Sequence, residues 1–182
     1  MMISNKERFK ELVKQYIKRD GVEQLMTFLE KSDFYTAPAS TRFHDSDEGG
    51  LCRHSIEVFN ELTKADHLDI SMETLALVSL FHDICKVNFY KVEMRNAKNE
   101  QGKWVQVPYY TVDDQLPLGH SEKSVIMLMD VIKLTTEEIM AIRFHMGGFE
   151  PKENYQYLSK AYERYPLALE LHIADMRATY KR

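Results

Sequence analysis

Six residues of types that bind metal ions are distributed along most of the chain. They are His54, His82, Asp83, His120, His145 and Asp175. Together they offer four imidazoles and two carboxylates, a mixed nitrogen and oxygen set that suits Mn, Fe, Zn, Co or Ni better than Ca²⁺. The chemistry that this set predicts is binding of one or two divalent transition-metal ions. Two ions that share a bridging carboxylate are a common arrangement in hydrolases.

The adjacent pair His82-Asp83 follows an almost wholly apolar run, LALVSLF. A helix that is apolar on all sides is a buried helix, and a carboxylate at its end is costly unless something offsets the charge. The pair alone has two simpler explanations. Asp83 can reach solvent while a backbone carbonyl satisfies His82, or Asp83 can form an ion pair with Lys86, one helical turn away. Each of the other four residues, taken alone, is also more often an ordinary polar residue than a metal ligand. The prediction of a metal site therefore depends on all six together.

The helical periodicity predicts about seven helices to position these residues. They are 5–19, 22–31, 51–65, 72–85, a segment that begins near Ser121, 136–145 and 166–179. Gly21 is expected to end the first helix, and Ser71 to cap the helix that leads to His82. Thr135 and Glu138 offer a capping box, and Pro166 suits the first turn of the last helix.

Residues 88–111 break the helical pattern. The stretches VNFYKVEMR and KWVQVPYYTV alternate, are rich in aromatic residues and are joined by NAKNEQG, which predicts a β-hairpin on the surface. Trp104, Tyr109 and Tyr110 have two interpretations. They can pack the hairpin onto the helices, which we expect, or they can stack against a nucleic-acid base.

The composition is typical of one soluble globular domain. The chain has 182 residues, of which 44% are apolar and 29% charged. A net charge of -4 and a pI of about 6.0 leave no electrostatic footprint for long duplex nucleic acid. The charged N-terminus lacks the apolar stretch of a signal peptide, and no segment is long enough to span a bilayer. Cys52 and Cys85 form no CxxC motif or disulfide framework. We therefore expect a cytoplasmic protein that does not bind membranes.

The order His, His-Asp, His, His, Asp resembles the HD superfamily of metal-dependent phosphohydrolases. The local sequences look like the HD domain of bacterial 3′→5′ exoribonucleases, and they are GGLCRHSIEVF, LFHDICK, LGHSEKS, IRFHMGG and LHIADMRA. A His-Asp pair alone is a weak signal, whereas five motifs in this order are specific. The resemblance implies an all-α helical bundle. It divides the single domain, 1–182, into an N-terminal helical extension, 1–38, and an HD core, 39–182.

The resemblance also implies roles for individual residues. The positions that hold one metal ion in the family are matched by His54, His82, Asp83 and Asp175. The extra histidines that hold a second ion, with Asp83 as the bridge, are matched by His120 and His145. Lys86 matches a lysine that contacts a phosphate oxygen, so Asp83 and Lys86 are the expected catalytic residues.

The chain departs from the family pattern in several places. Cys85 stands where many relatives have glycine, and we expect it to pack as a small buried residue. Met146 stands where relatives often carry a second histidine, so a third metal ion is not expected. No OB-fold precedes the HD core, which weakens the resemblance to exoribonucleases in particular. Arg42 and His44, in the polar loop before His54, are candidate substrate contacts, with a solvated loop as the alternative.

The expected function is hydrolysis of a phosphomonoester or phosphodiester, with a small phosphate compound, most simply a nucleotide, as the substrate. Water activated by a bound metal ion would be the nucleophile, and Lys86 would add positive charge near the phosphate. Two alternatives stay open. One is a 3′→5′ nuclease that acts on short single-stranded nucleic acid. The other is a metal-stabilised binding or regulatory module with little turnover.

Overall fold

The computed structural model describes residues 3–42 and 45–180. These residues form eight α-helices, three short 3-10 helices and one antiparallel sheet of two strands. The helices are α1 (Asn5–Tyr16), α2 (Val22–Glu30), α3 (Gly50–Leu62), α4 (Met72–Phe81), α5 (His120–Met129), α6 (Thr136–Phe144), α7 (Tyr155–Arg164) and α8 (Pro166–Tyr180). The strands are β1 (Tyr90–Lys98) and β2 (Trp104–Val112). The expected helical fold with one small hairpin is confirmed.

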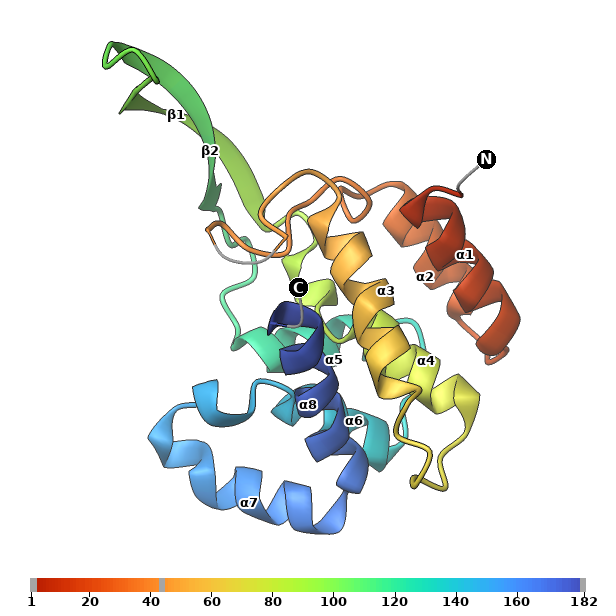
Figure 1. Cartoon of the computed structure of the whole chain (residues 1–182). Helices are drawn as coiled ribbons and strands as arrows, with labels where there is room; N and C mark the ends of the chain where they lie inside the picture. Colours follow the sequence, from red (N-terminus) through yellow and green to blue (C-terminus); the bar gives the residue numbers. More distant parts are fainter. Residues whose placement is uncertain (1–2, 43–44, 181–182) are drawn as a thin grey trace.

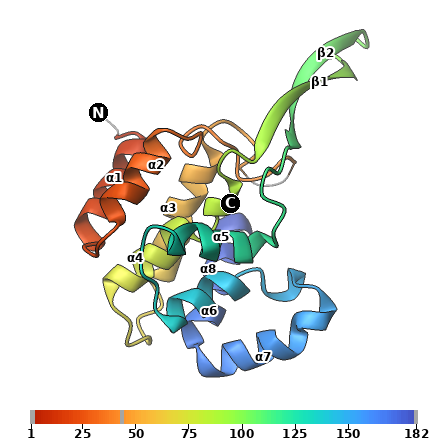
Figure 2. The same cartoon turned by 180° about the vertical axis from the view of Figure 1, so that it is seen from behind.

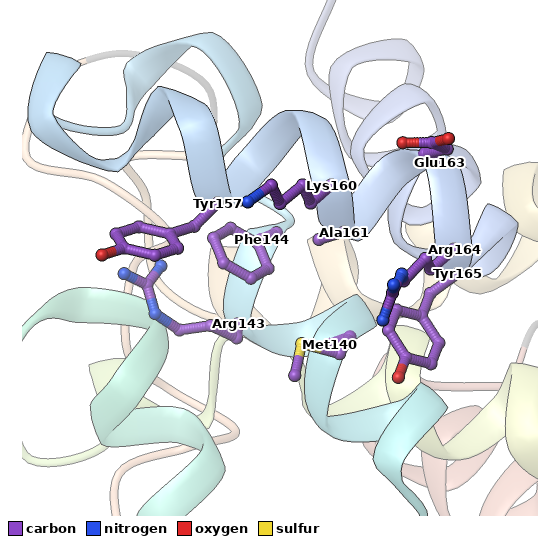
Figure 3. A pocket seen from close by; sticks show the side chains of 9 residues that line it. All are labelled: Met140, Arg143, Phe144, Tyr157, Lys160, Ala161, Glu163, Arg164 and Tyr165. Carbon is purple, nitrogen blue, oxygen red and sulfur yellow. The ribbon is translucent and has the colours of Figure 1, made fainter.

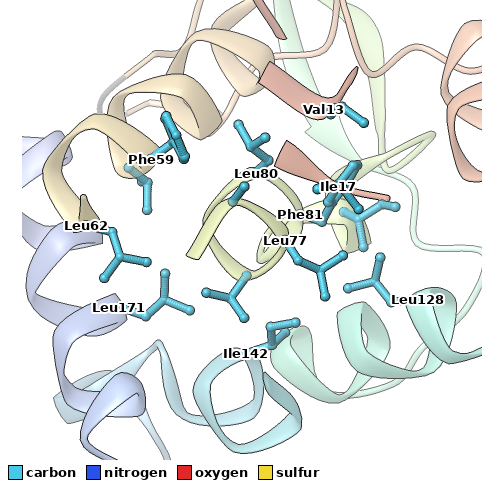
Figure 4. Close-up of a cluster of buried hydrophobic side chains, with 14 of the residues drawn as sticks. Val13, Ile17, Phe59, Leu62, Leu77, Leu80, Phe81, Leu128, Ile142 and Leu171 are labelled. Carbon is cyan, nitrogen blue, oxygen red and sulfur yellow. The ribbon is translucent and has the colours of Figure 1, made fainter. Parts of the chain in front are cut away.

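Helix α4 is the centre of the bundle. Every residue from Leu75 to Phe81 is buried, as the apolar sequence predicts. Figure 4 shows the α4 side chains surrounded by residues of α1, α3, α5, α6 and α8. The one polar side chain in this run, Ser79, donates its hydroxyl to the carbonyl of Leu75 at 2.6 Å. Because α4 is buried on all sides, the residues at its C-terminal end also lie deep inside the bundle.

The capping signals in the sequence are confirmed. The Ser71 hydroxyl accepts the backbone N–H of Thr74, and Thr135 and Glu138 make both hydrogen bonds of a capping box. Three helices end at least three residues earlier than expected, and one of them, α3, ends at Leu62 instead of residue 65. The first ends at Tyr16, because Ile17 is extended. The fourth ends at Phe81, because Asp83 leaves the helical region before a short 3-10 helix, Ile84–Lys86.

Helix α7 was not among the expected helices. Its sequence, YQYLSKAYER, does carry apolar residues at helical spacing, namely Tyr155, Leu158, Ala161 and Tyr162, although Ala161 is its only buried residue. The helix follows two 3-10 helices, Gly147–Phe149 and Lys152–Asn154. It connects α6 to α8 at one end of the bundle (Figure 1).

The β-hairpin extends away from the helices in both Figure 1 and Figure 2. The strands pair only with each other, from Tyr90 opposite Val112 at the base to Lys98 opposite Trp104 near the tip. At the base, the Tyr90 hydroxyl donates to the carbonyl of Ala39 at 3.3 Å. Trp104 is 68% exposed, so the expectation that it packs the hairpin onto the helices is wrong. The hairpin is stabilised by its own ladder rather than by the bundle.

Gly21 does not end α1 but precedes α2, with φ of 91°. A Cβ at this position would lie 1.7 Å from the carbonyl oxygen of Val131. Gly102, in the hairpin turn, also has a positive φ, 74°, but a Cβ there would have no atom within 4 Å. The two glycines therefore share the same backbone requirement and differ in the space around them.

This difference predicts unequal effects of alanine. Gly102→Ala should lower the free energy of unfolding by about 1–2 kcal/mol, the cost of a left-handed conformation. Gly21→Ala should cost about 1–3 kcal/mol more, because α2 must move away from Val131. Urea denaturation of both variants measures the difference. Equal losses would mean that the close approach of Gly21 to Val131 does not constrain the fold.

Within the part of the chain that the structure describes, no helix combines the length and the apolar composition needed to cross a membrane.

Candidate metal centre

The six predicted ligands lie on five different helices or at their ends. His54 is on α3 and Asp175 on α8. His82 is the C-cap of α4, His120 is the first residue of α5, and His145 is the C-cap of α6. Because α3 packs against α4 and α8, and α6 against α8, these positions meet at one place in the bundle. The structure thus brings together residues that are far apart in the sequence.

Asp83 lies at the middle of this cluster and is 3% exposed. Its Oδ1 atom lies 2.8 Å from Nε2 of His120 and 3.6 Å from Nε2 of His145. A carboxylate oxygen between two imidazoles is well placed to bind an ion together with either ring.

The other oxygen of Asp83, Oδ2, has a second set of neighbours. It lies 2.6 Å from Nζ of Lys86, 3.4 Å from Nε2 of His82 and 3.8 Å from Nε2 of His54. The two oxygens therefore face different histidines, as a bridging carboxylate requires. The interpretation that Asp83 reaches solvent is wrong. The Asp83–Lys86 ion pair is present, but it engages only one oxygen.

The orientation of His82 and His145 is set by backbone carbonyls. Nδ1 of His82 lies 2.8 Å from the carbonyl oxygen of Ser79, and Nδ1 of His145 lies 2.6 Å from that of Ile142. A carbonyl only accepts hydrogen bonds, so each neutral ring carries its proton on Nδ1 and has a bare lone pair on Nε2. This is the usual arrangement of a histidine that binds a metal ion.

Both bare Nε2 atoms point at Asp83 and are buried. Among the described residues, neither has a hydrogen-bond partner, and both rings are 0% exposed. A nitrogen lone pair that faces a carboxylate oxygen is repelled unless a cation lies between them, and buried polar atoms rarely lack a partner. The donor set therefore fits a divalent transition-metal ion.

Asp175 and His54 form a second part of the cluster. Oδ1 of Asp175 lies 3.0 Å from Nε2 of His54, and the rings of His54 and His82 have centroids 5.3 Å apart. Burial by itself raises the pKa of Asp175, but the hydrogen bond and the positive charge at His54 outweigh it and lower the pKa. Asp175 is thus anionic, the form that a metal ligand needs.

The charges around Asp83 favour the same protonation states. Burial opposes ionisation of Asp83, but the positive charge at Lys86 and the hydrogen bond from His120 hold its pKa well below the ordinary value. Burial also opposes the charged form of Lys86, yet the adjacent Asp83 carboxylate raises the pKa of the amine. Burial lowers the pKa of His120. The neutral imidazole that results is the form that binds metal ions.

Three overlapping triads have ligand atoms close enough to hold an ion. They are His54 with His82 and Asp175, His82 with Asp83 and His145, and Asp83 with Cys85 and His120. His145 thus groups with His82 as well as with Asp83, whereas the resemblance assigns these two histidines to different ions. Sγ of Cys85 lies 3.3 Å from Nδ1 of His120. Cys85 is 2% exposed, as expected of a small buried residue, and burial raises the pKa of its thiol to about 12.

The cluster lies at the wall of a cavity of about 710 Å³. Five of the predicted ligands and Lys86 line it, together with Ala39, Ser40 and Thr41 from the polar loop. Arg42 follows Thr41 in this loop and is exposed, so its predicted contact with the substrate stays a prediction. His44 lies outside the described residues.

Several residues around the cavity were not predicted from the sequence. They are Tyr90, Val112, Met146, Phe149, Met176, Thr179 and Tyr180. Most of them lie within five positions of a predicted ligand or of Lys86, which is the one sequence signal that points to them. Nδ1 of His172 lies 2.7 Å from the carbonyl oxygen of His145, so His172 supports the backbone of a ligand rather than the ion.

A second hollow, of about 680 Å³, lies between α6 and α7. Figure 3 shows Met140, Arg143 and Phe144 of α6 facing Tyr157, Lys160 and Ala161 of α7. It contains none of the predicted ligands. Five of the six predicted ligands line the first cavity instead.

Comparison of the chain with models of protein families, with curated proteins and with solved structures found no match.

Proposed function

We propose that this protein is a metal-dependent phosphohydrolase of the HD superfamily that acts on a nucleotide-sized phosphate ester. One observation carries the proposal. Two buried imidazoles, His82 and His145, direct bare Nε2 lone pairs at the two oxygens of a single buried carboxylate, Asp83. This arrangement is unfavourable without a cation and favourable with one. The order of the motifs in the sequence supports the same assignment.

Different residues of the chain would bind the metal ions and the phosphate group. Asp83 would bridge the ions, with His54, His82 and Asp175 on one side and His120 and His145 on the other. Bound divalent ions supply a Lewis acid and an activated water at neutral pH. Lys86 is held at the Asp83 oxygen and lines the cavity, so its amine can bind a phosphate oxygen of the substrate.

The size of the cavity supports a small substrate. A volume of about 710 Å³ is within the range of small-molecule sites and holds a nucleotide. Among the described residues that line this cavity, Lys86 is the only lysine or arginine. One fixed cation and a pair of metal ions match a single phosphate group better than a triphosphate chain, which usually engages further cations.

Metal content and phosphate release test the proposal together. The protein should be purified without chelators and its bound metals measured by mass spectrometry. It should then be assayed with Mn²⁺, Fe²⁺, Zn²⁺, Co²⁺ or Ni²⁺ against a panel of nucleotides, cyclic dinucleotides and short RNA. We expect one or two ions per chain and metal-dependent release of phosphate or nucleotide. Bound metal without any turnover would favour a binding or regulatory module, and no affinity for any of these metals would rule out the proposal.

The β-hairpin favours a second candidate, hydrolysis of single-stranded nucleic acid. Its paired base residues, Tyr90 and Val112, line the cavity. Towards the tip, Nζ of Lys98 lies 5.4 Å from the centroid of the exposed Trp104 ring. Over 90–112 the cations Lys91, Arg95, Lys98 and Lys103 outnumber Glu93 and Glu100. A cationic ribbon that leads out of the cavity and carries an exposed tryptophan near its tip is suited to a strand of several nucleotides.

Trp104 is the only tryptophan of the chain, so its fluorescence tests this candidate directly. Binding of a short single-stranded oligonucleotide should quench the emission, and Trp104→Ala should weaken binding by about 5- to 150-fold, the effect of losing one stacked base. A mononucleotide should leave the emission unchanged, because Trp104 lies eight residues along β2 from the cavity, roughly 27 Å. An oligonucleotide that binds no better than a mononucleotide would eliminate this candidate.

A further inference from the structure

Phe149 is exposed beside the candidate metal centre although the turn that carries it is firmly held. It lies four residues after His145, lines the cavity and is 64% exposed. In a mobile loop, an exposed phenylalanine would have no defined position. Here hydrogen bonds and close contacts hold the turn on both sides of Phe149, so the backbone position of Phe149 is defined.

The fixing contacts come from α6, α7 and α8. The Tyr155 hydroxyl donates to the carbonyl of Gly148 at 3.1 Å. The carboxylate of Glu150, which is 8% exposed, accepts from Arg143 at 2.8 Å and from Asn154 at 2.9 Å.

Gly147 allows the closest approach in this turn. It has φ of 54°, and a Cβ there would lie 2.3 Å from the ring of His172. These contacts anchor both sides of Phe149 while its ring remains open to the cavity.

Tyr180 provides a second exposed aromatic ring on the same cavity. It lies at the end of α8, five residues after Asp175, and is 70% exposed. Two large rings are thus presented to solvent, each close in sequence to a predicted metal ligand. Single exposed apolar residues are common on soluble proteins, but two aromatic rings on the wall of one cavity offer a surface on which the apolar part of a ligand can pack.

We propose that Phe149 and Tyr180 bind the base of a nucleoside phosphate by stacking, and that they thereby determine substrate selection. The inference rests on the proposed function, because it places the phosphate at Lys86 and the metal ions. Flat aromatic rings gain most from a flat partner, and every nucleobase has such a face. A sugar phosphate would reach Lys86 but would leave both rings exposed.

Matched pairs of substrates test this assignment. AMP and ribose 5-phosphate are a pair of monoesters that differ in the base. The p-nitrophenyl ester of thymidine 5′-monophosphate and methyl p-nitrophenyl phosphate are diesters with the same leaving group. The wild-type protein should prefer the member with the base by about 5- to 150-fold in kcat/KM, the effect of one stacking contact. The preference should lie in KM, because stacking acts equally on the bound substrate and on the transition state.

The variants should remove the preference and leave the base-free reaction unchanged. Phe149→Ala and Tyr180→Ala should each reduce the ratio between the members of a pair, and the double variant should bring it close to one. Phe149→Tyr should retain it. Tyr157→Ala is the matched control, because Tyr157 is 56% exposed but lies outside this cavity.

Two results would overturn the inference. One is a wild-type protein that treats both members of each pair alike. The other is a double variant that loses activity equally on both members, which would indicate a structural role. If no ester is hydrolysed, the proposed function fails instead. In that case calorimetric binding of AMP and ribose 5-phosphate still decides the inference, because a preference for AMP that the double variant loses requires no turnover.

Discussion

Asp83→Asn should lower the proposed phosphohydrolase activity by about 10²–10⁴-fold, the usual effect of removing a group that acts directly at a reacting centre. Asparagine keeps the shape of the side chain but removes the negative charge. Both oxygens of Asp83 face histidines that need a cation between them, so the neutral amide should also leave the protein with less than its full complement of metal. Phosphate release and metal content by mass spectrometry measure the two effects.

The loss of charge should also affect stability, because Lys86 loses its partner. The Lys86 side chain is 15% exposed and its amine lies 2.6 Å from Asp83, and an amine left mostly buried without a counterion is destabilising. Asp83→Asn/Lys86→Met should therefore recover thermal stability relative to Asp83→Asn, while activity stays low. This comparison separates loss of the catalytic site from loss of the fold.

His67→Ala is the matched control for Asp83→Asn, since His67 is 61% exposed and contacts Glu170 far from the cavity. It should keep wild-type metal content and activity. Full metal content and full activity in a folded Asp83→Asn protein would contradict the central position of Asp83.

The residue types of the candidate site could be predicted from the sequence, but its geometry could not. A histidine that follows an apolar helix is visible as a pattern, and so is an aspartate beside it. The hydrogen bonds that turn the Nε2 atoms of His82 and His145 towards Asp83 depend on the carbonyls of Ser79 and Ile142. Both carbonyls lie three residues before the histidine, which is a consequence of the helix ending there. The early end of α4 therefore turns Nε2 of His82 towards Asp83. The sequence predicted a longer helix, so this orientation could not be predicted from it.

The residues of the cavity wall were harder to predict, because only tertiary contacts bring them next to the candidate metal centre. Phe149 and Tyr180 are ordinary apolar residues in the sequence, and Tyr90 looks like part of a hairpin. They become candidates only because α6, α8 and the base of β1 converge around Asp83. The helix α7 could have been predicted, because Tyr155, Leu158, Ala161 and Tyr162 recur at helical spacing in its sequence.

The expected packing of Trp104 on the helices failed because of the hairpin's direction. Alternation and turn residues predict that two strands pair, and they do. Nothing in the pattern says at what angle a hairpin leaves the bundle. An isolated ribbon gains little from burial, so Trp104 near its tip stays exposed.

Glu138→Leu should lower the free energy of unfolding by about 3–5 kcal/mol, because it breaks a buried ion pair and leaves Arg19 only the longer contact with Glu73, at 3.4 Å. The Glu138 side chain is 0% exposed and accepts from both terminal nitrogens of Arg19, at 2.8 and 2.9 Å. It also accepts from the Thr74 hydroxyl at 2.9 Å and from the Thr135 backbone at 2.8 Å. One carboxylate thus connects the α1–α2 loop with the first turns of α4 and α6.

The same group predicts how stability depends on pH. Burial raises the pKa of Glu138, but the hydrogen bonds from Arg19 and Thr135 outweigh it, and the net pKa lies below the ordinary value of 4.5. A carboxyl whose pKa is lowered by folding stabilises the protein above its unfolded pKa, and this contribution is lost as the pH falls through the folded pKa. Between neutral pH and acid, the wild-type free energy of unfolding should therefore fall more steeply than that of Glu138→Gln.

Urea denaturation at a series of pH values measures both effects, with Glu137→Gln as the control in the same helical turn. Arg19→Met/Glu138→Leu should be more stable than Glu138→Leu alone, since it removes a guanidinium that has lost its closest counterion and keeps only the 3.4 Å contact with Glu73. If the double variant is no better than the single one, the cost of Glu138→Leu comes from the lost Thr74 and Thr135 hydrogen bonds rather than from Arg19. The candidate metal centre should be unaffected as long as α4 and α6 remain in register, because His82 and His145 lie at the opposite ends of these helices.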